Sequence, residues 1–542
     1  MRQRAIVCWL SGLLLPLLGA AAESYTYVHH PVSTDRVAAQ EAFDRGLTMI
    51  YAYAPDEAQL SFELAAKLDP SLAMAWWGVA LSYGANINNE PQLEATHKAA
   101  EALLHASELA RAHATAEEQA YIAALTTRYS SVAQPDFDAL ALNYREAMRA
   151  LMAANPDDPD AAALYAEALM DLHPWRLWGN DGAPAPGTEE LVGMLEEHLA
   201  RSPLHIGLMH FYIHAVEAGP HPERALAVAQ RLGSLPMEPA AAHLVHMPAH
   251  IYLKVGDWPA AIAANEHSVH HALDYRHSAY PADQQACGHC LDFLRYAYGM
   301  VGNLAGARMA AEHVETLWED PSERLSVLVL FGQWDEVLGV PEPTRVEQPH
   351  NSNVHLTHGF WHYARGMAFA ATARPEQAEV ELAALRSEAG QLPARYLVPA
   401  GALGLEHTLD DLFRETDQET LALADAVLRA RLAEARGQGA AAIAQWRAAV
   451  ALQDHSAYSE PPLWYYPVRD SLGAALLRGG AARAAEAVFK EDLERTPNDP
   501  RAYFGLAAAY TALHQRTAAT EAEAKFRSAW QLADRPLALS DL

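Results

Sequence analysis

Small and aromatic residues recur along the chain at the spacing of a repeating unit of about 34 residues, built from two helices and a turn. Near the start the recurring residues are Gly46, Ala58, Phe62, Ala65, Pro70 and the run Trp76 to Tyr83. Near the end they are Gly473, Ala485, Phe489, Pro497, Tyr503, Leu506, Ala507 and Tyr510. Small residues let paired helices approach closely, and aromatic residues fill the gaps between them. The pattern therefore predicts an all-α fold, a solenoid of antiparallel helix pairs.

The helix-pair pattern continues through the middle of the chain with irregular loop insertions. Residues 256–261 and 302–307 have the Gly-rich composition of a turn that leads into a second helix. Residues 341–354 are rich in Pro and Asn and predict a linker between two halves. The expected units are an N-terminal solenoid over 23–340 and a C-terminal array over 355–542.

Composition and charge limit the kinds of partner that we expect, and the first residues indicate the compartment. The 542 residues include 68 acidic and 39 basic side chains, a net charge of −29, which argues against nucleic acid or an anionic membrane as a partner. Residues 1–22 have a basic start, an apolar run too short for a membrane span, and small residues at the expected cleavage point. We expect a cleaved signal peptide, an exported protein that is periplasmic or secreted, and no membrane span.

Two histidine pairs stand out in the central part of the sequence. His210 and His214 are four residues apart, as are His246 and His250, so each pair shares one face of a helix. Both members of the second pair follow the first by 36 residues, close to the repeat length. Neutral imidazole is a common ligand of copper, zinc and iron. The two pairs predict a transition-metal site with one ion, or two close together, although a polar groove that binds peptide would use the same residues.

The repeat marks resemble the tetratricopeptide repeat (TPR). In such arrays the second, fifth and ninth positions of the first helix face the concave groove. Matched by their turns, the middle units place seven side chains at these positions. These are His210, His214, His243, His246, His250, His289 and Asp292. The resemblance thus implies that they converge on the concave face, with the two His pairs innermost, His289 and Asp292 next, and His243 as an outer ligand.

Longer stretches resemble a largely uncharacterised family of exported bacterial TPR proteins. The most specific is His243-Leu244-Val245-His246-Met247-Pro248-Ala249-His250, and residues 73–78, 210–217 and 460–467 also match. Where the family often has a His-Asn-x-His-Phe run, this chain has 289–293, so that Asp292 replaces a histidine. The resemblance brings no settled activity with it.

Cys287 and Cys290 form a Cys-Gly-His-Cys motif and are the cysteines left once the expected signal is removed. That motif matches the active site of thiol oxidoreductases, which need a strand before it and a helix after it. The preceding residues 280–285 predict a loop instead. A structural disulfide, metal ligation, free thiols and redox catalysis all remain open for the pair.

Three functions from different classes follow from these patterns. The first is a TPR-type solenoid that binds a transition metal through histidines, with its role in catalysis left open. The second is an interaction scaffold that holds a protein or peptide in its concave groove. The third is thiol–disulfide exchange at Cys287 and Cys290. Residues 172–188, which carry Trp175 and Trp178, are either a solvated connector or a loop that covers a bound substrate.

Overall fold

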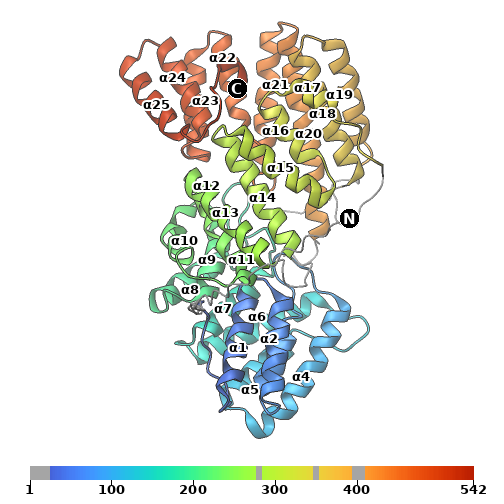
Figure 1. Cartoon of the computed structure of the whole chain (residues 1–542), viewed down its shortest axis with the longest axis vertical. Coiled ribbons are helices and arrows are strands. Elements are labelled where there is room, and N and C mark those ends of the chain that lie inside the picture. The colour runs from blue at the N-terminus through green and yellow to red at the C-terminus, as the bar shows by residue number, and fades with distance from the viewer. Residues whose placement is uncertain (1–24, 276–282, 346–352, 393–408) are drawn as a thin grey trace, which may run out of the picture.

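The computed structural model describes residues 25–275, 283–345, 353–392 and 409–542. Within these residues the regular structure is helical and contains no β-strand, which confirms the predicted all-α fold (Figure 1). Consecutive helices form antiparallel pairs that stack side by side, as expected for a TPR-type α-solenoid. The expected signal peptide, residues 1–22, lies outside the described residues.

The helices are numbered α1 to α25 in chain order. Helices α1 to α9 span Val37–Tyr51, Pro55–Leu68, Ala73–Leu81, Leu93–His113, Ala116–Thr126, Phe137–Ala154, Pro159–Met170, Thr188–Arg201 and Ile206–Glu217. Helices α10 to α17 span Leu226–Leu232, Ala242–His246, Pro248–Val255, Trp258–Tyr275, Asp283–Met300, Leu304–Trp318, Ser322–Leu330 and Trp334–Gly339. Helices α18 to α25 span Val354–Ala371, Pro375–Ala389, Leu409–Ala435, Gly439–His455, Val468–Arg478, Ala482–Arg495, Pro500–Ala512 and Arg516–Ala529.

The recurring Gly and Phe residues pack in the same way at the two ends of the chain. The buried ring of Phe62 in α2 lies so close to α3 that a Cβ at Gly78 would sit 2.3 Å from its Cδ1. Phe489 in α23 has the same relation to α24, where a Cβ at Gly505 would lie 2.1 Å from its Cζ. Glycine is therefore required at both positions by the aromatic ring that fills the gap between neighbouring helices.

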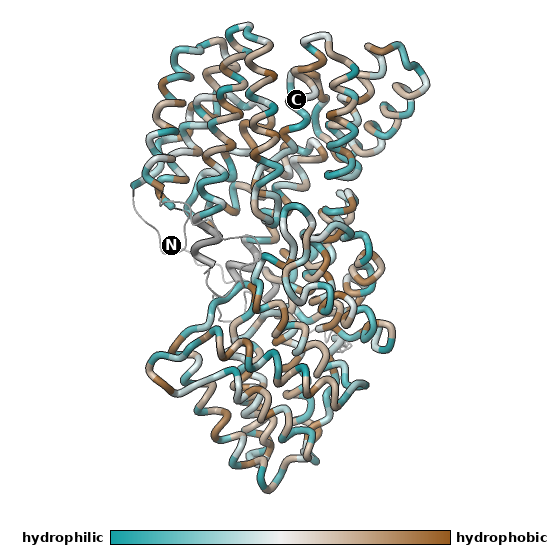
Figure 2. Tube along the Cα trace, turned by 180° about the vertical axis from the view of Figure 1, so that it is seen from behind, coloured by the Kyte–Doolittle hydropathy of each residue, from teal (hydrophilic) through white to brown (hydrophobic). Residues whose placement is uncertain are grey.

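The core consists of three clusters that follow one another along the chain. The first extends from Val28 to Ile251, the second from Ala242 to Phe331, and the third from Leu325 to Leu542. Figure 2 shows brown apolar and teal polar positions mixed along most helices, the pattern of helices that bury one stripe. No helix in the described part of the chain has the length and apolarity to cross a membrane.

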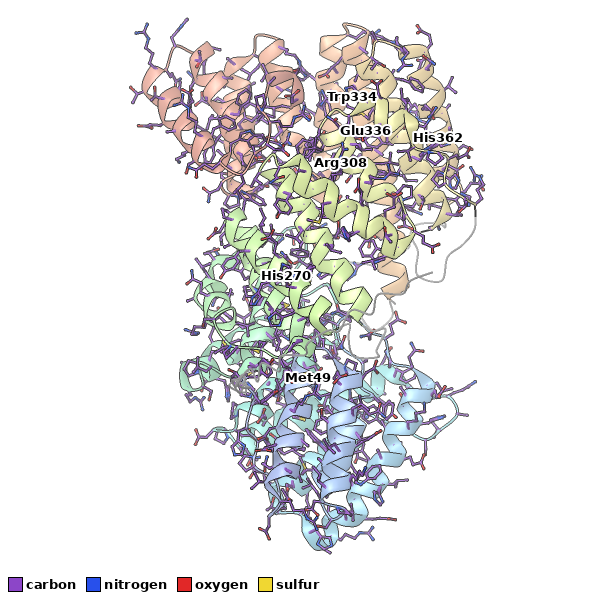
Figure 3. The ribbon with its side chains drawn as sticks, viewed as in Figure 1. Met49, His270, Arg308, Trp334, Glu336 and His362 are labelled. Atoms are coloured by element: carbon purple, nitrogen blue, oxygen red, sulfur yellow. The ribbon has the colours of Figure 1, made fainter. Side chains whose placement is uncertain are left out.

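The third core contains residues from both sides of the expected linker at 341–354. It includes Leu325, Val329 and Val337, which precede the linker and pack with the C-terminal helices. In Figure 3 Arg308, Trp334 and Glu336 lie together at this junction, where Arg308 of α15 and Glu336 of α17 form a 2.8 Å ion pair. Residues 346–352 lie outside the described residues, so the expected boundary stays a prediction.

The C-terminal helices also return to the middle of the chain. Arg501 of α24 donates a hydrogen bond to the carbonyl of Gly299, and Trp258 donates one to the carbonyl of Asn498. Figure 1 shows α22 to α25 beside α12 to α15, although some 200 residues separate them in the sequence. This packing brings a C-terminal loop residue, Glu460, to the histidine-rich centre.

Candidate metal centre

Six histidines form two groups in which the ligand atoms lie within 4.8 Å of one another. Set A contains His210, His214 and His243, and set B contains His246, His250 and His289. The rings of His214 and His250 are 5.6 Å apart, and those of His243 and His246 are 6.0 Å apart. The two sets are therefore neighbours inside one centre.

Helices α9, α11, α12 and α14 supply these side chains, and α1 and α13 support them. In Figure 1 these elements meet at the middle level of the molecule, where Figure 3 labels Met49 of α1 and His270 of α13. His210 and His246 have no exposed surface, and His250 is 2% exposed. Four of the six histidines are thus buried between helices, whereas His243 and His289 are partly exposed, with the His289 side chain 31% exposed.

The ring of His210 is fixed by the end of α1. Its Nδ1 lies 2.7 Å from the carbonyl oxygen of Tyr51, which can only accept a hydrogen bond. The proton of the neutral ring is therefore on Nδ1, and Nε2 presents its lone pair to His243, whose own Nε2 is 3.1 Å away. This orientation is typical of a metal-binding imidazole whose second nitrogen holds the ring in place.

One carboxylate, Glu217, holds a histidine from each set. Its Oε1 accepts a hydrogen bond of 2.6 Å from Nδ1 of His214, and its Oε2 accepts one from Nδ1 of His250. Glu217 is the last residue of α9, three positions after His214, and is 3% exposed. The Nε2 atom of His214 is then left buried without a hydrogen-bond partner. An orphaned, buried lone pair of this kind fits a metal ligand.

The hydrogen bonds of His246 and His250 determine which ring nitrogens of this pair carry protons. The side-chain amide nitrogen of Asn265 donates a hydrogen bond of 2.8 Å to the carbonyl of Ala261. The other side-chain atom of Asn265, Oδ1, lies 2.5 Å from Nδ1 of His246. Because this oxygen can only accept, Nδ1 of His246 is the donor. Nδ1 of His250 likewise donates to a carboxylate. The two Nε2 atoms nevertheless face each other at 2.7 Å. Two lone pairs repel at this distance, so the contact requires either a shared proton or a metal ion.

Without a bound metal, the pKa values of the central histidines are shifted in opposite directions. Burial, and then the charge of neighbouring imidazoles, holds the pKa of His210, His243 and His246 well below the usual value. Although burial opposes it, the carboxylates of Glu217 and Glu460 raise the pKa of His250 to about 10. Without metal, His250 carries the proton between the two Nε2 atoms. A metal ion would replace that proton.

Glu460 begins the family-like stretch 460–467 but was not predicted to belong to the centre. Its Oε2 lies 2.6 Å from Nδ1 of His250 and 4.0 Å from Nε2 of His289, and its side chain is 7% exposed. The ring of Tyr458, two residues earlier, lies 4.7 Å from Nζ of Lys254 and 6.2 Å from the ring of Trp175. The loop before α22 therefore covers the centre together with the loop that carries Trp175.

Tyr53 was also missed, and it contacts set A. Its ring centroid lies 4.7 Å from that of His210, 5.4 Å from that of His243, and 6.0 Å from that of His214. It has a left-handed φ of 52°, and its buried hydroxyl has no hydrogen-bond partner. A strained residue held against functional groups is common at binding sites. Tyr53 is hard to recognise as a site residue from the sequence, because it lies in the turn after α1 and not at a repeat position of a helix.

Asp292 lies apart from both sets. Its Oδ1 forms a 2.6 Å ion pair with Nε of Arg295, three residues later on the same helix, and this pair is largely buried. The structure therefore does not bring Asp292 together with the histidines as expected, because Arg295 provides a closer partner.

The cysteines are placed by the structure only in part. The side chain of Cys287 lies outside the described residues. Cys290 is buried in α14, and its Sγ lies 3.2 Å from the hydroxyl of Ser268. His289, at the neighbouring position of the same helix, belongs to set B, whereas Cys290 is a member of neither set.

His358 and His362 have the same spacing as the central pairs, but their rings make contacts typical of a structural role. His358 is fully buried, and its ring nitrogens lie 2.8 Å from the carbonyl of Val354 and 3.0 Å from that of Pro343. His362, labelled on α18 in Figure 3, pairs with Glu381 at 2.7 Å. Neither ring is turned toward another imidazole of a set, in contrast to the central pairs.

Comparison with known proteins adds little on function. No protein-family model matches the sequence, and no curated protein matches it. Among solved structures, a human IFIT1 dimer with m7Gppp-AAAA has a TM-score of 0.31 and 11% identity over 93% of this chain and 92% of that one. Yeast Tom70 has a TM-score of 0.30 and 10% identity over 92% of each chain. Likeness at this level gives no information on a ligand or partner.

Proposed function

We propose that this chain is a TPR-type solenoid protein that binds a transition-metal ion, copper, zinc or iron, through its central histidines. The observation that carries the proposal is the direction of the rings. His210, His214, His246 and His250 each engage Nδ1 with an oxygen, and their Nε2 atoms are left for the interior of the centre. Neutral imidazoles held in this way are typical ligands of these metals.

The proposed ligands are the six members of sets A and B. Glu217 and Glu460 would balance part of the positive charge and orient the rings, whereas Asp292 and the cysteines would not coordinate. Whether the metal would catalyse a reaction depends on an open coordination position, as at catalytic zinc sites. Export, through the apolar segment at residues 1–22, is part of the same proposal.

Metal analysis of protein purified without an affinity tag tests the proposal. We expect at least one equivalent of a transition metal, or its tight uptake on titration, and loss of that uptake when His210 and His246 are both changed to Ala. Less than about a tenth of an equivalent of every transition metal, with no uptake on titration, would refute metal binding.

The second candidate function is a peptide-binding scaffold. It is favoured by a cavity of about 410 Å³ beside α4 to α7, whose walls include Tyr83, Tyr129, Phe137 and Tyr144 together with Arg128. The lining also holds Arg176 and three carboxylates, and Arg128 is paired with Asp171 at 2.8 Å, so these walls suit a largely apolar or aromatic segment of a peptide. Peptide capture that survives a chelator and the loss of His210 and His246 would favour the scaffold over the metal protein.

A further inference from the structure

We infer that the centre holds two metal ions, one in set A and one in set B. This inference rests on the proposed function and adds to it the number of ions and the ligands of each. Sets A and B share no residue, and each brings three ligand atoms within 4.8 Å of one another. Three protein ligands are a common complement for a catalytic zinc or a similar ion, which takes its fourth ligand from solvent or substrate.

A single tetrahedral ion cannot use all six imidazoles. Zinc in proteins usually takes four ligands, and two Nε2 atoms bound to one tetrahedral zinc lie about 3.3 Å apart. Within the sets the facing Nε2 atoms are 3.1 Å apart for His210 and His243, and 2.7 Å apart for His246 and His250. The spacing of His210 and His243 is thus close to that around an ion of their own, whereas His246 and His250, which share a proton without metal, would move apart by about 0.6 Å to bind one. The division into two sets rests on the ligand atoms, which lie within 4.8 Å of one another in each set. Ring-centroid distances are similar within a set, 6.2 Å for His214 and His243, and between the sets, 5.6 Å for His214 and His250.

Glu217 would couple the two ions. One of its carboxylate oxygens bonds to Nδ1 of His214 in set A, and the other bonds to Nδ1 of His250 in set B. A change in charge at one ion therefore reaches the ring orientation at the other through a single side chain. The arrangement is a carboxylate–histidine–metal relay shared by two sites rather than duplicated.

The charges and ligand types indicate the class of metal. All six inner ligands are imidazole nitrogens, whereas magnesium, calcium and manganese prefer oxygen ligands. The two nearby carboxylates, Glu217 and Glu460, are buried and offset part of the charge of two cations. Copper and zinc fit this ligand set best.

The decisive experiment is a titration of metal-free full-length protein with Zn²⁺ and with Cu²⁺. We expect two equivalents for the unchanged protein, and one equivalent for either paired variant, His210→Ala with His214→Ala or His246→Ala with His250→Ala. The matched control is His267→Ala with His271→Ala, an exposed i, i+4 pair on α13 whose Nε2 atoms lie 3.0 Å apart. This control variant should still bind two equivalents.

Two outcomes separate this inference from the proposed function. One equivalent in the unchanged protein, and none in either paired variant, would overturn the two-ion arrangement and leave one shared metal centre. No uptake in the unchanged protein would overturn the proposed function itself.

A second measurement needs no variant and therefore does not depend on folding of the mutants. The electron paramagnetic resonance spectrum of the Cu²⁺-loaded protein should be broadened or diminished at two equivalents, because two ions in adjacent sets couple magnetically. A spectrum of magnetically isolated ions at full loading would contradict adjacent occupation of sets A and B.

Discussion

At the scale of single residues, the orientation of each imidazole is decided by the atom that accepts its Nδ1 proton. The acceptors are the carbonyl of Tyr51, both oxygens of Glu217, and the amide oxygen of Asn265. A backbone carbonyl and a carboxylate leave no choice of donor, so the ring tautomers follow from the contacts. The side chains that support the histidines therefore determine the centre as much as the histidines themselves.

The first prediction separates the two carboxylates. Glu217→Gln should weaken metal binding at both sets by about 10- to 100-fold, because the amide cannot accept both Nδ1 protons. Glu460→Gln should weaken set B alone, because Glu460 contacts His250 and not His214. Titration of both variants with Zn²⁺ checks this difference. Equal effects of the two substitutions at both sets would contradict the shared role of Glu217.

The second prediction concerns a buried acidic cluster away from the centre. Asp470 has no exposed surface and neither of its carboxylate oxygens has a hydrogen-bond partner, and Asp492 and Asp499 lie close by. Burial, followed by these like charges, raises the pKa of Asp470 well above its usual value. The folded protein therefore binds more protons than the unfolded chain, so that stability falls as pH rises above the unfolded pKa of about 3.9.

Asp470→Asn should accordingly stabilise the protein at neutral pH, by on the order of 1–3 kcal/mol, and should flatten its loss of stability with rising pH. Thermal melting from acid to neutral pH measures both effects. The control is Glu101→Gln on the exposed face of α4, away from the acidic cluster, which should leave the pH profile unchanged. Lower stability of Asp470→Asn at every pH would show that the carboxylate is stabilising as it stands.

At the scale of helices, the His246 to His250 spacing survives an interruption that the sequence did not make obvious. Helix α11 ends at His246, and α12 begins at Pro248, which has no N–H to donate. Met247 between them keeps right-handed helical angles, so the two imidazoles still lie on one face. Periodicity predicted this face correctly, although the chain forms two short helices there.

The third prediction tests the packing between helices. Gly505→Ala should lower the stability by about 1–3 kcal/mol, because its Cβ would overlap the buried ring of Phe489. That loss should outweigh the gain in helix propensity of about 1 kcal/mol. Gly439→Ala at the start of α21, where no atom lies within 4 Å of the added Cβ, is the control and should be neutral or stabilising. Denaturant unfolding of both variants gives the comparison, and an unchanged Gly505→Ala would refute the packing argument.

The sequence predicted the helix pairs and the convergence of the six histidines, because these features follow local periodicity. That these histidines bind metal stays a prediction. The sequence could not predict Glu460, which lies about 200 residues away and reaches His250 only through the return of the C-terminal helices. Asp292 is the opposite case, a residue that the sequence placed in the centre and that the structure pairs elsewhere. It occupies the expected repeat position, but a partner three residues away, Arg295, pairs with it.

At the scale of the whole molecule, one core contains residues from both sides of the expected linker at 341–354. Trp361 of α18 donates a hydrogen bond to the carbonyl of Val340, and Thr357 donates one to Asp320. Leu325 and Val337 are fully buried against the C-terminal helices. Helix α17 therefore packs with the C-terminal helices although it precedes the linker. Helix α16 packs on both sides, because Leu325 belongs to the third core and Val327 to the second.

The fourth prediction follows from this packing. A fragment over residues 320–542 should be more stable than one over 355–542, because the shorter fragment exposes the surface that Leu325 and Val337 cover, at about 1.5–3 kcal/mol for each side chain. Chemical unfolding followed by circular dichroism compares the two without added metal. Equal stability of the fragments would place the boundary at the linker, as the sequence suggests.

The most direct test of the metal centre is the anomalous diffraction of crystals loaded with Zn²⁺ or Cu²⁺. The account predicts two adjacent peaks, each at about 2.0–2.1 Å from the Nε2 atoms of one histidine set. Peaks only at surface histidines such as His267 and His271, with the central imidazoles still in their hydrogen-bonded arrangement, would contradict it.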